Sequence, residues 1–275
     1  MVSWHMAESI SPCEKRRRSD MAIILNEYKW AENAIQEKSL GQKPIETLTR
    51  IAKYYIQNGV TKNDARKMLD LFLLSCDASV SLVKWAERLD SIVKYAAKYP
   101  LISIDHVSVS SLELAKIKEL QSVQVQRLAF TLLCIAKFNH MINDKNEYWV
   151  NTSDNEVMKM ANIGTSIKRQ SLMYSKLRDA GMIRFSNRVD SLSVQVLFVC
   201  GDDEEIKISD FRNLGYQYLM HDDDRGIYKV CENCGITFKA RQPHTPGRPK
   251  KYCDSCAIKV KMKQNVDSIM RLKYK

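Results

Sequence analysis

The chain has 275 residues, of which 45% are hydrophobic and 27% charged, so it can bury a sizeable core and is not expected to be disordered throughout. Only 9 glycines and 6 prolines occur, too few for a turn-rich β-sandwich, and no run of about 18 apolar residues could form a transmembrane helix. Lysine and arginine outnumber aspartate and glutamate by 43 to 32, and this net charge of +11 favours a polyanionic partner.

Residues 1–20 have the features of a flexible basic tail. They carry the run Lys15–Arg18 and show no apolar periodicity. The basic cluster follows the short apolar stretch instead of preceding it, which is the wrong order for a secretory signal. We therefore expect a cytoplasmic location, or a nucleoid-associated one if the protein binds DNA. In such a reducing compartment the eight cysteines need a role other than disulfides.

Residues 21–100 are predicted to form a helical domain of four helices. The first spans about 21–39 and the fourth about 79–98, with apolar residues at helical spacing. Thr61 and Asp64 resemble a capping box ahead of the third helix. A domain of this kind commonly mediates dimerisation, so a homodimer is one of the expected states.

Residues 101–200 begin with an extended segment and a long helical pattern. The pattern runs from 111 to about 142, with a break expected near Ser122. Its second half, from Leu128 to Phe138, is apolar almost all round and should be buried.

A compact series of signals follows between residues 147 and 199. It comprises a strand at 147–150, a helix opened by a Ser153–Glu156 capping box, a turn with Gly164 at positive φ, a helix at 166–180 stopped by Gly181, and strands at 182–185 and 192–199. The stretch from Leu177 to Ile183 resembles the end of the recognition helix and the first wing strand of winged helix-turn-helix proteins. The resemblance implies a DNA-binding domain whose second helix enters the major groove.

The helix at 166–180 should have a buried face and a DNA-contacting face. The expected buried face is formed by Leu172, Met173, Leu177 and Ala180. Polar side chains on the other face can reach phosphates and base edges, and the hairpin arginines can reach the flanking backbone. The expected contacts are Ser166, Lys168, Arg169, Gln170, Lys176, Arg184 and Arg188. Alternatively, these charges form a solvated helix face and the domain contacts proteins.

Positive charge is concentrated at the C-terminal end of the chain. Twelve basic residues occur between residues 229 and 275 against three acidic ones, whereas 201–228 holds eight acidic and three basic residues. We therefore expect 201–228 to be an acidic connector. The clusters Asp202–Glu205 and Asp222–Asp224 are interpreted as solvated turns, because adjacent carboxylates point in different directions.

Two C-x2-C motifs form the most specific pattern in the chain. Cys231 and Cys234 are separated by 18 residues from Cys253 and Cys256. Two residues between thiolates let both sulfurs bind one metal ion, and the spacer lets a hairpin bring the second pair opposite the first. We predict one structural zinc ion per chain, with strands on either side of the first pair. A redox role is the rival interpretation, but it needs a βαβ context that the sequence does not have.

The pattern C-x-x-C-G-x-x-F … K-Y-C-x-x-C is similar to zinc ribbons at the C-termini of many small phage and mobile-element proteins. The resemblance covers about 30 residues and implies the metal more firmly than any activity. The spacer and the basic helix or tail after it form a candidate phosphate-binding surface, with contacts from Arg241, Arg248, Lys250, Lys251, Lys259, Lys261 and Lys263. In the alternative interpretation, the zinc only stabilises a small appendage.

No catalytic motif is recognisable in the sequence. It contains no Gly-rich phosphate loop, no G-x-S-x-G turn and no H-E-x-x-H helix, so we do not expect an enzyme. Cys76 and Cys134 lie in apolar helical context and are expected to be small core residues.

These patterns predict a mainly α protein with an N-terminal helical domain, a central winged helix and a C-terminal zinc ribbon at 229–275. The leading hypothesis is sequence-selective binding of double-stranded DNA, as a phage or mobile-element transcription regulator or replication accessory factor. The second hypothesis is a phage-type inhibitor or adaptor that binds a host protein. The third is RNA or single-strand binding through the zinc ribbon.

Overall fold

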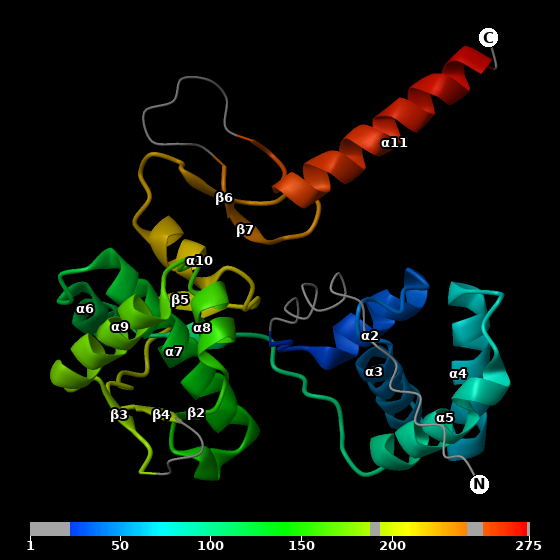
Figure 1. Cartoon of the computed structure of the whole chain (residues 1–275), viewed down its shortest axis with the longest axis horizontal. Coiled ribbons are helices and arrows are strands. Elements are labelled where there is room, and N and C mark those ends of the chain that lie inside the picture. Colours follow the sequence, from blue (N-terminus) through cyan, green and yellow to red (C-terminus); the bar gives the residue numbers. More distant parts are fainter. Residues whose placement is uncertain (1–22, 188–192, 241–249, 274–275) are drawn as a thin grey trace, which may run out of the picture. The chain divides into compact units, whose positions relative to one another are not determined.

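The computed structural model describes residues 23–187, 193–240 and 250–273 (Figure 1). Within these residues the protein is mainly helical, with ten α-helices and seven short strands, which confirms the predicted mainly α class. The chain divides into two compact units, Met1–Asp105 and His106–Lys275. The predicted basic tail at 1–20 lies outside the described residues.

The first unit packs four helices around one apolar core. These helices are α2 (Glu27–Gln36), α3 (Pro44–Gln57), α4 (Lys62–Cys76) and α5 (Leu82–Ala96). The fully buried residues recur at three- and four-residue spacing within a helix, as in Leu48 and Ile51 of α3 and Leu69 and Leu73 of α4. This spacing places the apolar side chains of each helix on one face, which the other helices cover.

Side chains cap the N-termini of two of these helices, α2 and α4. Asn26 Oδ1 accepts a hydrogen bond from the backbone N–H of Lys29 at 2.9 Å, so α2 begins well after residue 21. Thr61 Oγ1 accepts from the backbone N–H of Asp64 at 3.2 Å, which is one half of the predicted capping box, while the Asp64 carboxylate accepts from the Thr61 hydroxyl at 2.8 Å. The two bonds from the backbone satisfy N–H groups that have no partner within the helix.

The second unit combines helices with three small antiparallel sheets. Its helices are α6 (Ser111–Lys118), α7 (Val123–Ile142), α8 (Asp154–Met160), α9 (Ile167–Asp179), α10 (Leu214–His221) and α11 (Asp254–Lys273). Its strands are β1 (Val107–Val109), β2 (Trp149–Val150), β3 (Ile183–Phe185), β4 (Val194–Val196), β5 (Ile206–Ile208), β6 (Tyr228–Val230) and β7 (Thr237–Lys239). Strand β1 pairs with β5, β4 lies between β2 and β3, and β6 pairs with β7.

Helix α7 forms the centre of this unit's core. All side chains from Leu128 to Ala136 are buried, as the all-round apolar sequence predicts. The expected break before it is present, because α6 ends at Lys118 and Ser122 is the N-cap of α7. Near the start of α7, Arg127 Nε and Nη2 donate to the Ala161 carbonyl at the end of α8, at 2.9 and 2.6 Å.

The segment 201–228 is part of the folded unit and not only an acidic connector. It contains β5 and α10, and its residues Phe211 and Leu214 are fully buried. Strand β5 pairs with β1 in the register Val107↔Ile208. The acidic residues suggested a solvated connector. The apolar residues between them pack into the core, and this packing makes the segment part of the fold.

A buried ion pair joins α6 to α7. Lys137 Nζ lies 2.7 Å from Glu113 Oε2, and the Glu113 side chain is completely buried. The same carboxylate accepts from the backbone N–H groups of Ser110 at 2.8 Å and Cys200 at 3.1 Å, and Lys137 Nζ also donates to the Ser108 carbonyl at 2.7 Å. These bonds leave the buried charge well satisfied, as burial of a carboxylate demands.

Two predicted details of the segment that contains α8 and the turn after it are wrong. The Ser153 side chain makes no cap bond to the backbone; its Oγ donates instead to Glu156 Oε2 at 3.0 Å. The positive φ in the turn after α8 belongs to Asn162, at 55°, and not to Gly164. Asparagine tolerates this left-handed conformation better than most residues.

The contact of α10 with the end of α8 depends on Gly215. A Cβ atom at this position would lie 1.9 Å from the Ala161 carbonyl oxygen and 2.9 Å from Arg127 Nε. We expect Gly215→Ala to separate the two helices and to cost about 2 kcal/mol or more. Hydrogen exchange should show lost protection in α8 and α10. Gly164→Ala is the control, since its Cβ meets nothing within 4 Å, and equal stability of the two variants would contradict the prediction.

Candidate metal centre and nucleic-acid surface

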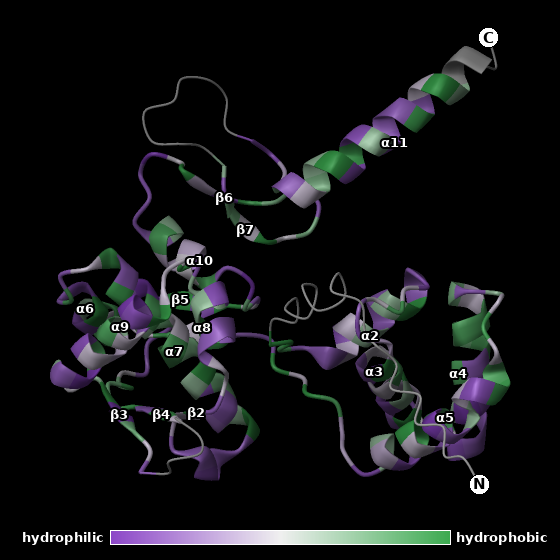
Figure 2. Cartoon of the chain, viewed as in Figure 1, coloured by the Kyte–Doolittle hydropathy of each residue, from purple (hydrophilic) through white to green (hydrophobic). Residues whose placement is uncertain are grey.

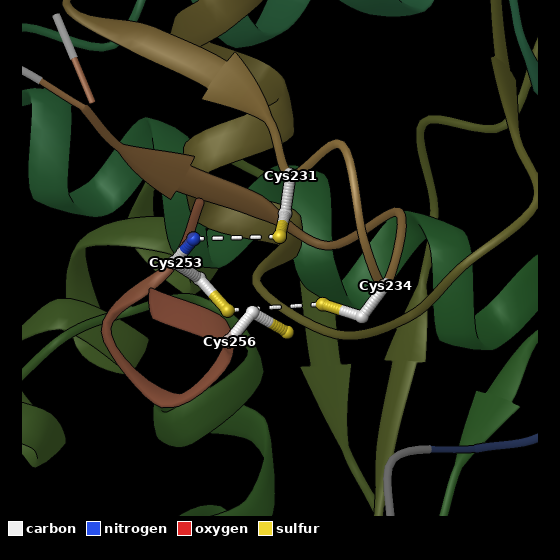
Figure 3. Close-up of side chains that lie close together, drawn as sticks. All are labelled: Cys231, Cys234, Cys253 and Cys256. Carbon is white, nitrogen blue, oxygen red and sulfur yellow. Dashed lines mark hydrogen bonds between the residues drawn. The ribbon is translucent and has the colours of Figure 1, made fainter. Parts of the chain in front are cut away.

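The structure brings the four predicted cysteine ligands together. The Sγ atoms of Cys231, Cys234, Cys253 and Cys256 all lie within 4.8 Å of one another, and three of these residues are buried (Figure 3). Cys234 Sγ lies 3.7 Å from Cys253 Sγ. Zinc–sulfur bonds of about 2.3 Å in a tetrahedron place sulfurs about 3.8 Å apart, so this donor set could hold a metal ion of that kind.

The hairpin of β6 and β7 positions the first two sulfurs. Its strands pair from Tyr228↔Lys239 to Val230↔Thr237, as the sequence predicts for the segments beside the first cysteine pair. Gly235 adopts a φ of 72°, and its N–H donates to the Cys231 carbonyl at 3.0 Å. Glycine suits this tight turn because it has no Cβ to oppose a positive φ.

Cys253, directly before α11, and Cys256 in its first turn supply the other two sulfurs. The Cys253 backbone N–H donates to Cys231 Sγ at 3.4 Å, which Figure 3 shows as a dashed line. Asn233 Nδ2 donates to Cys256 Sγ at 3.2 Å. Four thiolates fill a tetrahedral shell, so a metal held here has no open position for water and its role would be structural.

The protein environment acts differently on the individual thiols. Burial opposes ionisation of Cys231, but backbone N–H groups aimed at its sulfur outweigh burial and lower its pKa to about 6. Burial and the neighbouring thiols raise the pKa of Cys234 to about 12. A bound cation would overcome the raised pKa of Cys234, because it favours the deprotonated form of all four thiols.

Arg212 lies beside the cysteine cluster, a position that the sequence motifs do not predict. Its Nη2 donates to the Cys234 carbonyl at 2.9 Å and lies 2.6 Å from Asp210 Oδ2. The Asp210 carboxylate is the main cause of its raised pKa, opposed by burial, and Cys234 and Cys253 contribute further. The guanidinium can therefore offset part of the negative charge of four thiolates. Arg212 and Cys234 are 22 residues apart, and no local sequence pattern indicates that they meet.

Two asparagines connect the cysteine hairpin to the turn between α8 and α9. Asn213 Nδ2 donates to the Thr237 carbonyl in β7 at 2.8 Å. Asn162 Nδ2, in the turn, donates to Asn213 Oδ1 at 2.8 Å. The hairpin is thus fixed to the body of the second unit by polar contacts.

The remaining described cysteines stand apart from the cluster. Cys134 is fully buried in α7, as expected for a core residue, and burial raises the pKa of its thiol. Cys76 is half-buried in α4, and Cys200 is half-buried after β4.

Helix α9 places most of the predicted DNA-contacting residues on its exposed face. Ser166, Lys168, Arg169 and Lys176 are exposed, while Gln170 is half-buried and its Nε2 donates to the Thr165 carbonyl at 3.3 Å. The buried face consists of Met173, Tyr174 and Leu177. The predicted burial of Leu172 and Ala180 is wrong, because the core contacts only a narrow stripe of the helix.

The predicted DNA-contacting cations of α9 have no acidic partner among the described residues, whereas Arg178 pairs with Asp179 at 2.9 Å. Within the described residues no ion pair forms at Lys168, Arg169 or Lys176, and the first turn of the helix holds no acidic residue. In β3, the Arg184 guanidinium lies 5.7 Å from the centre of the Trp149 ring. This stacking holds the exposed arginine beside the three-stranded sheet. Arg188, the remaining predicted contact of this region, lies outside the described residues.

The predicted C-terminal phosphate contacts fall into three groups. Lys250 pairs with Asp254 at 2.8 Å and Lys251 with Glu232 at 3.6 Å, so acidic neighbours offset both charges. Exposed lysines occupy the first half of α11, namely Lys259, Lys261 and Lys263. Two arginines lie outside the described residues, namely Arg241 and Arg248.

Among the described residues, no helix combines the length and the apolar character that a membrane crossing requires. Comparison of the chain with protein-family models, with curated proteins and with solved structures finds no match.

Proposed function

We propose that α7, β2, α8, α9, β3 and β4 form a winged helix that binds double-stranded DNA, with α9 as the helix that enters the major groove. The element order α7, β2, α8, α9, β3, β4 supports this proposal, as does the sheet order β2-β4-β3. In a winged helix the strand before the second helix pairs with the hairpin in this way, and the third helix stays free on one face.

The first turn of α9 carries the proposal. The helix dipole favours anions at an N-terminus, yet this turn presents Lys168 and Arg169 and no acidic residue. Its N-cap, Ser166, makes no side-chain bond to the free N–H groups. A phosphate would satisfy both the N–H groups and the cations at once.

Exposed apolar side chains next to these cations fit a base-reading surface. Ile167 is 79% exposed and Leu172 is 56% exposed. Apolar side chains in the major groove contact the methyl group of thymine, and lysine and arginine bind guanine or phosphate. Arg184, stacked on Trp149, would contact the backbone beside the groove.

We further propose that the metal ion is zinc and that it stabilises the hairpin as a ribbon. The four-sulfur donor set and the 3.7 Å separation between Cys234 Sγ and Cys253 Sγ support zinc. The exposed lysines of α11 would add phosphate contacts, while Lys250 and Lys251 would contribute less because they are paired. The motif resemblances favour a transcription regulator or replication accessory factor of phage or mobile-element type.

Charge reversal on α9 tests DNA binding directly. We expect Lys168→Glu with Arg169→Glu to weaken duplex binding by roughly 100-fold or more, because two phosphate attractions become repulsions. The slope of log K against log salt should fall in magnitude by about 1.8, at about 0.9 for each lost contact. Fluorescence anisotropy titrations at several salt concentrations measure both quantities.

The matched control reverses a second exposed pair of cations, Lys84 and Arg88 in α5 of the first unit. The control has the same charge change and should keep most of the affinity. If both double variants bind DNA equally, α9 is not the contact surface. Two further experiments test specificity. Competition with single-stranded DNA and RNA measures the preference for duplex, and selection of duplexes from a random library measures the preference for sequence.

A further inference from the structure

Helix α11 presents an apolar face that nothing in the described structure covers. Beyond Cys256 its described side chains are exposed, apart from the half-buried Val260. Five large apolar side chains are between 50% and 63% exposed, namely Ile258, Met262, Val266, Ile269 and Met270. In Figure 2 hydrophobic and hydrophilic bands alternate along this helix. Most of the stability of helices in proteins comes from packing of an apolar face and not from helix propensity, so a partner surface would stabilise α11.

Three of these five residues, Ile258, Met262 and Ile269, fit a heptad repeat, whereas Val266 and Met270 fall at its e and b positions. Ile258, Met262, Asn265 and Ile269 are separated by four, three and four residues, and the sequence continues this spacing at Leu272. Residues at these intervals form the seam of a two-stranded coiled coil. The repeat places Asn265 within an otherwise apolar seam, at a d position.

We propose that the occupant of this face is α11 of a second copy of the chain, in a parallel, in-register coiled coil. In that arrangement Asn265 meets its own copy, and the two amides can hydrogen-bond to each other within the seam. A wholly apolar groove that buried this amide would leave it without a hydrogen-bond partner, which costs about 1–3 kcal/mol.

The charges beside the seam are compatible with self-association. A g position faces the e position five residues later on the other helix. This rule places Asp254, which also pairs with Lys250 of its own chain at 2.8 Å, opposite Lys259 of the second copy. It places Lys261 opposite Val266, which the lysine stem can cover. No pair of like charges is opposed in this part of the helix. Nucleic acid would contact the lysines but leave the apolar stripe in water.

Sedimentation velocity of the full chain without DNA tests the proposal. We expect a weak dimer that dissociates across the micromolar range, because the seam is short. Met262→Asp with Ile269→Asp should leave a monomer at every concentration. Val83→Asp is the control, since Val83 is 87% exposed in α5 of the first unit, and this variant should dimerise as the natural chain does. A monomeric natural chain, or a dimer that the seam variant retains, would overturn the proposal.

The register is tested by Asn265→Cys. Parallel pairing brings the two residues at position 265 close enough for a disulfide, whereas Ser268→Cys, at a g position, should link far less. With diamide as the oxidant, two thiols lose their protons and electrons to form one S–S bond, and peptide mapping of the zinc-loaded protein identifies the linked pair. Dimers without a 265–265 link overturn the parallel arrangement. This inference does not depend on DNA binding, because a monomer that still binds duplex would refute only the coiled coil.

Discussion

We expect Cys253→Ser to abolish binding of the proposed zinc ion and to unfold the hairpin that carries the cysteine cluster. The four sulfurs are the common centre of β6, β7 and the first turn of α11, and the apolar cluster around them is small. A segment of this size draws most of its stability from the metal. Metal analysis after dialysis should show a fall from about one zinc ion per chain to nearly none. Hydrogen exchange should show lost protection in β6 and β7.

The control for this variant is Cys76→Ser, which changes a half-buried cysteine outside the cluster. It should retain the metal and the protection of β6 and β7. A chelator should reproduce the effect of Cys253→Ser in the natural chain, because both remove the same ion. Full metal content in the Cys253 variant would show that this sulfur is not a ligand.

The second large effect is expected at the ion pair inside the second unit. Lys137→Met removes the cation that lies 2.7 Å from Glu113 Oε2 and leaves a completely buried carboxylate. Breaking a buried pair in this way costs about 3–5 kcal/mol, because the remaining charge has lost its partner. Backbone N–H groups of Ser110 and Cys200 still bind the carboxylate, so the loss should lie towards the lower end of that range. Chemical denaturation measures this loss of unfolding free energy, and hydrogen exchange shows whether it affects α6 and α7.

Lys118→Met is the matched control, since it makes the same substitution at an exposed pair in the same unit. Lys118 Nζ lies 2.7 Å from Asp222 Oδ2, but the two side chains are 46% and 55% exposed. Exposed pairs contribute about 0–1 kcal/mol, so this variant should be nearly as stable as the natural chain. Similar losses in the two variants would refute a special role for the buried pair.

Helix and strand positions could largely be predicted from neighbouring residues. The flanking strands of the cysteine hairpin fall at the predicted positions, and Gly181, at a φ of 70°, follows α9 as expected. Element ends were less predictable: α2 starts at Glu27 because the Asn26 side chain caps it there. The capping interaction competes with apolar periodicity, and periodicity alone does not contain it.

The candidate metal site was predictable to the residue because its information is local and chemical. Two C-x2-C motifs specify both the ligand type and the reach of the chain, and the structure places all four sulfurs together. Its surroundings were not predictable. Arg212 and Asn233 reach the cluster through contacts that only the folded chain creates.

The sequence by itself determined the mainly helical character, the cysteine cluster and the basic exposed face of α9, since each depends on spacing within one short segment. Only the tertiary structure decided that 201–228 belongs to the folded unit, through pairing of Val107 with Ile208 and burial of Phe211. It also decided that Glu113 and Lys137 meet and that Leu172 faces solvent. These contacts depend on which distant apolar surfaces pack together, and no local sequence pattern predicts the free energy of that packing.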